Sequence, residues 1–158
     1  MSGLVLALLL TSPPPPVVSV SAAEIVRLAP GARADARLAV RVKEGFRVQA
    51  TPASAPYLIP LRLTLQAGSG LAPGVPVYPR GTPYRLQGAE SDLLTYEGSF
   101  EVTVPLVAAK SAPPGRRTLQ GELRYQACDA RICLRPASVP VTLTIEIAER
   151  SHRVDRVP

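Results

Sequence analysis

Residues 139–147 read Val-Pro-Val-Thr-Leu-Thr-Ile-Glu-Ile, and every second side chain from Val139 to Ile147 is apolar. This alternation is typical of a β-strand with one buried face, because successive side chains of a strand point to opposite sides. The same two-residue period recurs in five earlier segments, residues 36–42, 46–50, 61–66, 100–106 and 119–125. Six half-buried strands are therefore expected along the chain.

Turn-forming residues separate these segments, at Glu44-Gly45, Gly68-Ser69-Gly70 and Pro113-Pro114-Gly115. Short alternating strands divided by such turns predict an all-β protein, with an immunoglobulin-like antiparallel β-sandwich as its fold. In the segment 46–50 the alternation assigns Val48 to the inner face and Gln49 to the outer face. A helical bundle is excluded by the prolines, which stand at positions 52, 56, 60, 73, 76, 79 and 83.

The composition also argues against several classes of function. The chain has 158 residues with two cysteines, one methionine and one histidine, His152, so neither a metal site nor a bound cofactor is expected. Catalysis by a serine–histidine or cysteine–histidine pair needs a histidine packed beside the nucleophile, whereas His152 lies in a polar tail. The net charge of +6 is spread along the chain without tryptophan, so nucleic-acid binding is not expected either.

The N-terminal residues indicate export. An apolar run from Leu4 to Leu10 is too short to span a bilayer, and small residues at Val20-Ser21-Ala22 match a signal-peptidase site before Ala23. We therefore predict a signal peptide over residues 1–22, a single folded domain over 23–150 and a disordered tail over 151–158. The location would be periplasmic or otherwise extracytoplasmic, where disulfides persist.

Residues 70–94 break the alternation and are rich in proline and glycine. A connection of this length within a compact domain is more often functional than accidental, although a plain surface loop with a short edge strand at Val75–Tyr78 is the simpler alternative.

Cys128 and Cys133 are separated by four residues, a spacing that lets a tight turn bring them into a disulfide. Such a small loop contributes roughly 2 kcal/mol on the chain-entropy model, so the bridge would stabilise the domain little. Two nearby thiols are what exchange chemistry requires, and Arg131 between them favours the reactive thiolate while Asp129 opposes it. From spacing alone, a redox pair and a structural brace remain equally open.

The segment Tyr125-Gln126-Ala127-Cys128-Asp129-Ala130-Arg131-Ile132-Cys133-Leu134-Arg135-Pro136 resembles the active-site segment of a known family, the N-terminal periplasmic domain of thiol:disulfide interchange proteins of the DsbD type. Three further motifs match that family in order: Tyr57-Leu58-Ile59-Pro60, Val77-Tyr78-Pro79 and Tyr96-Glu97-Gly98. The resemblance covers about residues 35–148 and implies an immunoglobulin-like fold with a redox-active disulfide.

The resemblance also implies roles for individual residues. Cys133 would form the mixed disulfide with a partner and Cys128 would resolve it, supported by Tyr125, Gln126 and Arg131. A cap loop shields the disulfide in this family, and residues 79–94 occupy the corresponding stretch, with Tyr84 as the candidate shield. We predict that this loop is a movable lid with Gly81 and Gly88 as hinge points.

The partners implied by the resemblance are periplasmic thioredoxin-like proteins and disulfide isomerases, including thioredoxins of cytochrome c maturation, together with a membrane-embedded electron donor. We expect a monomer. The competing interpretation is a non-catalytic immunoglobulin-like interaction module in which the same disulfide acts as a local brace.

Overall fold

The computed structural model describes residues 16–149, and this part of the chain contains twelve strands and no helix. The strands are β1 (Val18–Ala22), β2 (Val26–Leu28), β3 (Arg33–Val42), β4 (Arg47–Gln49), β5 (Arg62–Leu65), β6 (Leu71–Pro73), β7 (Thr82–Tyr84), β8 (Leu93–Tyr96), β9 (Ser99–Ala108), β10 (Gly115–Tyr125), β11 (Ala127–Cys128) and β12 (Ala137–Ile147). Within residues 16–149, no helix is long and apolar enough to cross a membrane.

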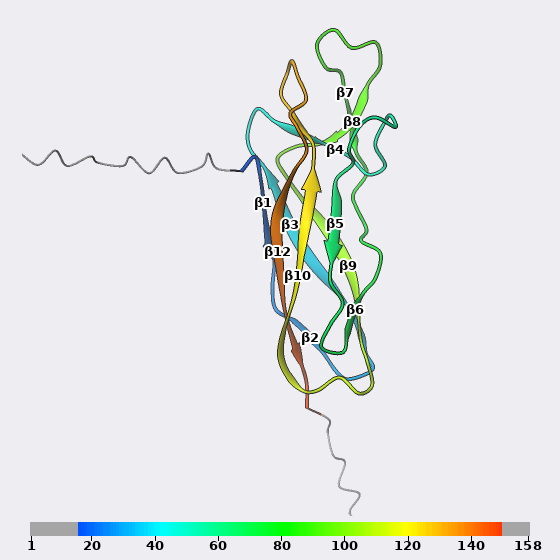
Figure 1. Cartoon of the computed structure of the whole chain (residues 1–158), viewed down its shortest axis with the longest axis vertical. Helices are drawn as coiled ribbons and strands as arrows, with labels where there is room; N and C mark the ends of the chain where they lie inside the picture. The colour runs from blue at the N-terminus through cyan, green and yellow to red at the C-terminus, as the bar shows by residue number, and fades with distance from the viewer. Residues whose placement is uncertain (1–15, 150–158) are drawn as a thin grey trace, which may run out of the picture.

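Two four-stranded sheets form an elongated sandwich (Figure 1). Sheet A has the order β1-β3-β9-β6, and sheet B has the order β2-β12-β10-β5. The alternation read from the sequence forms the core between them: Leu38 and Val40 of β3 and Leu143 and Ile145 of β12 are at most 1% exposed. The predicted all-β sandwich is thus confirmed, and each of the six predicted segments contains a strand.

One strand pair is not antiparallel. β2 runs parallel to β12, with Val26 opposite Ile145 and Leu28 opposite Ile147. The alternating pattern cannot reveal this, because a three-residue strand carries too little periodicity to be recognised.

The sandwich begins before residue 23. Strand β1 pairs with β3 along its whole length, and Val18 is fully buried in the core. The range predicted as a signal peptide therefore overlaps the first strand of the fold, although removal of a leader stays a prediction. The predicted tail 151–158, with His152, lies outside the described residues.

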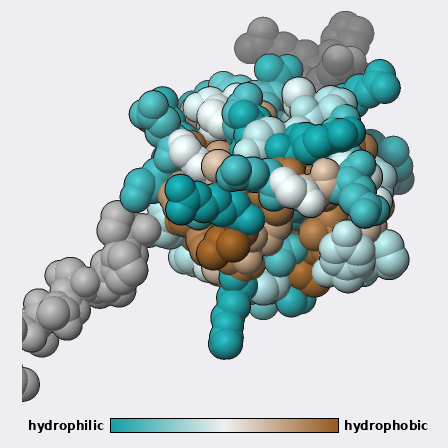
Figure 2. Space-filling view, turned by 90° about the horizontal axis from the view of Figure 1, so that it is seen from above, coloured by the Kyte–Doolittle hydropathy of each residue, from teal (hydrophilic) through white to brown (hydrophobic). Residues whose placement is uncertain are grey.

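A third sheet, sheet C, lies at one end of the sandwich and has the order β11-β4-β8-β7. Its strands are two to four residues long, and they connect the turn that contains both cysteines with the excursion that begins at residue 70. Figure 2 views the molecule from this end, where apolar brown surface lies among teal polar side chains. Sheet C is the element that positions the candidate site.

Candidate functional site at the Cys128–Cys133 disulfide

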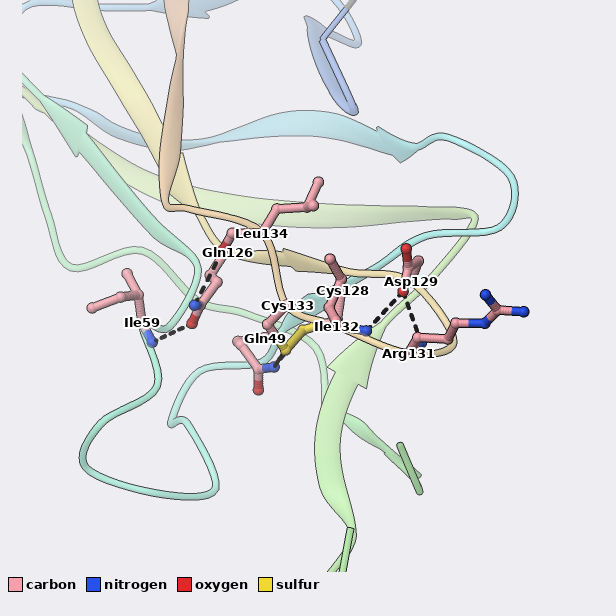
Figure 3. The surroundings of a disulfide bond; sticks show 9 residues. All are labelled: Gln49, Ile59, Gln126, Cys128, Asp129, Arg131, Ile132, Cys133 and Leu134. Carbon is pink, nitrogen blue, oxygen red and sulfur yellow. Dashed lines mark hydrogen bonds between the residues drawn. A yellow bond between two sulfur atoms is a disulfide. The ribbon is translucent and has the colours of Figure 1, made fainter. Parts of the chain in front are cut away.

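Cys128 and Cys133 form a disulfide across a tight hairpin, with their Cα atoms 3.9 Å apart (Figure 3). Two backbone hydrogen bonds flank the bridge: Asp129 N–H donates to the Ile132 carbonyl at 3.0 Å, and Leu134 N–H donates to the Ala127 carbonyl at 2.7 Å. The disulfide therefore joins two positions of a ladder that is already hydrogen-bonded on both sides.

The turn between the cysteines is organised by Asp129. Its Oδ1 accepts hydrogen bonds from the backbone N–H groups of Arg131 at 2.7 Å and Ile132 at 2.8 Å, as in an Asx turn. These bonds favour the carboxylate form and lower the pKa of Asp129, with the Ile132 bond contributing most.

Arg131 lies in this turn, but its guanidinium points away from the sulfurs (Figure 3). The side chain is exposed. The expectation that Arg131 supplies positive charge to a thiolate is therefore not supported by its orientation in the disulfide state.

The two cysteines differ in exposure. Cys128 is 1% exposed, whereas Cys133 is partly exposed. Tyr125, at the end of the alternating segment 119–125, faces the core and is 4% exposed. A reactant from solvent thus meets Cys133 before Cys128.

Gln126 joins three segments of the site. Its side-chain Oε1 accepts from Ile59 N–H at 3.0 Å, and its Nε2 donates to the Leu134 carbonyl at 3.3 Å. Gln126 thereby holds the residue after Cys133 and the loop between β4 and β5 in fixed positions. Within residues 16–149 both side-chain hydrogen bonds of Gln126 go to backbone groups, so Gln126 supports the site by fixing these segments.

Gln49 is the residue that the sequence analysis missed. The alternation placed Gln49 on the outer face of its strand. The residue is nevertheless fully buried, because the cysteine turn, which follows β11, packs against that face of β4. Its Nε2 lies 3.2 Å from Cys128 Sγ and 3.9 Å from Cys133 Sγ. No local signal distinguishes Gln49 from an exposed glutamine such as Gln66; only the pairing of β4 with β11 does.

Tyr84 shares one face of sheet C with Cys128. The register pairs Tyr84 with Leu93 on β7 and β8, and Cys128 with Arg47 on β11 and β4. The ring of Tyr84 is half-buried, and the guanidinium carbon of Arg47 lies over it, 4.2 Å from the ring centroid. Arg47 also forms an ion pair with Glu97. Tyr84, Arg47 and Cys128 line one small pocket of about 190 Å³.

The predicted lid, residues 79–94, contains the short strand β7 and the start of β8, which pair as an antiparallel hairpin joined by the loop of residues 85–92. An ion pair between Arg85 and Asp92 at 2.7 Å closes its far end, and Gln87 N–H reaches the Ala130 carbonyl of the cysteine turn at 3.4 Å. Packing, and not backbone conformation, requires a glycine at position 81, because a Cβ there would lie 2.6 Å from the Cβ of Ala50.

Tyr78, the other tyrosine of the excursion, is engaged elsewhere. Its hydroxyl accepts a hydrogen bond from Leu63 N–H at 2.8 Å, and burial raises its pKa. The alternative expectation for this stretch was a short edge strand at Val75–Tyr78. The structure has a single β-bridge there, between Val77 and Thr103.

Comparisons with known proteins agree with this geometry. Residues 17–145 match the family model described as thiol:disulfide interchange protein DsbD, N-terminal. A search of curated proteins found no match. The fold is similar to the N-terminal periplasmic domain of ScsB from Proteus mirabilis, with a TM-score of 0.52 and 14% identity over 87% of this chain. The match spans 49% of the ScsB chain, about half its length.

Two further solved structures have lower TM-scores. The PapD-like domain 7 of human CEP192 has a TM-score of 0.37 and 13% identity, and the match covers 95% of this chain and 98% of that chain. A family 123 glycoside hydrolase from Clostridium perfringens has a TM-score of 0.39 and 8% identity, and the match covers 85% of this chain and 28% of that chain. The family model covers most of the sandwich and both cysteines, and the chain belongs to the family of the N-terminal domain of thiol:disulfide interchange protein DsbD.

Proposed function

We propose that this domain relays electrons between disulfide proteins through the Cys128–Cys133 pair. The observation that carries the proposal is a disulfide at one end of the sandwich, with one cysteine buried and the other partly exposed. A bridge that closes so short a loop adds only roughly 2 kcal/mol of stability on the chain-entropy model, so bracing the fold is a weak reason for it.

The proposed exchange has two steps and transfers two electrons. The Cys133 thiolate attacks the disulfide of a partner, which releases one partner thiolate and leaves a mixed disulfide on Cys133. The Cys128 thiolate then attacks Cys133 Sγ, which re-forms the Cys128–Cys133 bridge and releases the second partner thiolate. The two protons lost by the cysteines neutralise the two partner thiolates. The reverse sequence reloads the domain from a reduced donor.

Family membership and the ScsB neighbour support a periplasmic setting and thioredoxin-like or isomerase partners. We further propose that Tyr84 and the β7–β8 hairpin shield the disulfide until a partner docks. The position of Tyr84 on the same sheet face as Cys128, in the wall of the same pocket, supports this role.

The reduction potential tests the relay against the structural brace. The chain is equilibrated with glutathione buffers of known ratio, and the fraction of reduced Cys128–Cys133 pair is measured by alkylation and mass spectrometry. A relay predicts a potential in the range of exchange proteins, above about −300 mV. A value well below that would show a disulfide that the glutathione pool cannot reduce, as expected of a brace.

Trapping tests the assignment of roles. A Cys128→Ala variant is incubated with an oxidised thioredoxin-like protein as the probe, and Cys133→Ala is the matched control. The proposal predicts a mixed disulfide that accumulates with Cys128→Ala, because the resolving thiol is missing. Equal trapping by both variants would contradict distinct roles for the two cysteines.

A further inference from the structure

Gln49 places an amide against both sulfurs of the site. The side chain is fully buried, and its Nε2 lies 3.2 Å from Cys128 Sγ, within the range of an N–H···S hydrogen bond, while Cys133 Sγ is farther away at 3.9 Å (Figure 3). A disulfide sulfur can only accept a hydrogen bond, so the donor end of the amide faces the bridge.

The backbone holds this amide in place. Gln49 N–H donates to the Gln126 carbonyl at 3.1 Å, and the Gln49 carbonyl accepts from Leu61 N–H at 3.1 Å. The residue is therefore fixed from both neighbouring segments, and its side chain meets the sulfurs without a rearrangement of the sheet.

The other end of the amide is left unpaired. Oε1 of Gln49 is buried and has no hydrogen-bond partner among residues 16–149. A buried acceptor without a partner destabilises a fold, and an apolar side chain of the same shape would avoid that cost. Packing alone therefore does not explain an amide at this position, whereas the contact of its Nε2–H group with Cys128 Sγ does.

We propose that Gln49 is a positioning residue that stabilises the thiolate of Cys128 and so directs attack onto Cys133; this rests on the exchange function proposed above. When a donor thiolate attacks Cys133 Sγ, the bond between the two cysteine sulfurs breaks and its electron pair remains on Cys128. The nearby Nε2–H donates to that developing charge, and a better-stabilised leaving thiolate departs faster.

The same contact acts in the opposite direction of exchange. After Cys133 has formed a mixed disulfide, Cys128 must lose its proton to become the attacking thiolate, and the amide N–H favours the charged form. Gln49 therefore acts on Cys128 in both directions, while Cys133 remains the sulfur that meets the partner.

Other charged groups around Cys128 contribute less directly. Arg47 on β4 shares the small pocket with Cys128 but is engaged by Glu97 and the Tyr84 ring. Asp129 follows Cys128 and carries a negative charge, which opposes a thiolate, and the Arg131 guanidinium points away. Gln49 is the group for which the structure gives a hydrogen bond to sulfur.

The test replaces the amide by an apolar side chain of similar length. Gln49→Met is made in the full chain carrying Cys133→Ala, and the thiolate of Cys128 is titrated by its ultraviolet absorbance. We expect the pKa of Cys128 to rise by about one unit, which corresponds to about tenfold less thiolate at a given pH below that pKa. Gln66→Leu, at an exposed glutamine, is the control and is expected to leave the pKa unchanged.

A second measurement uses the intact cysteine pair. Gln49→Met should slow reduction of the disulfide by dithiothreitol about threefold to tenfold, whereas the urea midpoint should stay unchanged or rise, because the unpaired Oε1 has been removed. If Gln49→Met does not fold, Gln49→Leu replaces it in both measurements.

The proposal is overturned if the folded variant keeps the Cys128 pKa of the parent, or if the variant only loses stability. These outcomes are independent of the relay itself. A reduction potential below about −300 mV in the unmodified chain would reject the relay, even if Gln49→Met shifts the pKa of Cys128. A reduction potential above about −300 mV, combined with no effect of Gln49→Met, would reject only the role of Gln49.

Discussion

Cys128 and Cys133 are five positions apart, yet Cys128 is buried and Cys133 is partly exposed. The difference arises because Cys128 is the last residue of β11, which pairs with β4, whereas Cys133 lies on the returning arm of the turn. Burial by a neighbouring strand, and not the sequence around the cysteines, sets the asymmetry.

This asymmetry predicts different rates of alkylation. In the reduced protein a maleimide should modify Cys133 well before Cys128, since reaction requires access to the sulfur. Peptide mapping after short reaction times measures the two rates, and denatured protein, in which both thiols are accessible, supplies the reference. Faster modification of Cys128 would reverse the assignment of the attacking cysteine.

Asp129 makes the turn sensitive to acid. Its pKa is lowered by the hydrogen bonds from Ile132 and Arg131 N–H, so the carboxylate stabilises the folded state above the unfolded pKa of about 3.9, and that contribution disappears as the pH falls through the lower folded value. Asp129→Asn keeps an acceptor for the turn but does not titrate. Its urea midpoint should fall less than that of the parent between neutral pH and about pH 3. Parallel curves would show that the titration of Asp129 is not coupled to folding.

At the scale of elements, the sequence predicts the sandwich well and sheet C poorly. Strands β3, β9, β10 and β12 are ten or eleven residues long, so their alternation is unmistakable. Sheet C is built from strands of two to four residues, and of these only β4 falls within a segment recognised by its alternation, residues 46–50. The cysteine turn was found from its residues. Gln49 lies on the face opposite Val48, as the alternation predicts, but that face is buried rather than exposed, because the cysteine turn that covers it comes from a distant part of the chain.

The β7–β8 hairpin carries the proposed shield. Tyr84→Ala should accelerate reduction of the disulfide by dithiothreitol, because removal of the ring opens the pocket beside Cys128. Tyr57→Ala is the matched control, since Tyr57 is 78% exposed. Circular dichroism verifies that both variants keep the fold. An unchanged reduction rate in folded Tyr84→Ala would remove Tyr84 as the shield, and Tyr78 cannot replace it while its hydroxyl is bonded to β5.

At the scale of the whole molecule, the first strand decides where the folded domain starts. Signal-peptide rules place a cleavage site after Ala22, yet β1 occupies residues Val18–Ala22 and forms one edge of sheet A. Small residues suit both a cleavage site and an edge strand, so the pattern alone could not separate the two.

A chain that begins at Ala23 should be less stable than one that begins at Pro16. It loses the pairing of β1 with β3 and the burial of Val18, a side chain that contributes roughly 1.5–3 kcal/mol when removed from water. Urea denaturation of the two purified chains measures the difference. Equal midpoints would show that β1 adds nothing to the fold and that processing after Ala22 is harmless.

The parallel pairing of β2 with β12 also has a consequence for the order of events in time. Residues Val26–Leu28 are synthesised long before their partner, residues Ile145–Ile147, which follows more than a hundred positions later in the chain. Sheet B therefore cannot be completed until β12 has been synthesised, because β2 and β10 both pair with β12 and precede it in the chain. The completion of sheet B thus depends on a contact between segments that are far apart in the sequence, and we expect it to be a slow step of folding.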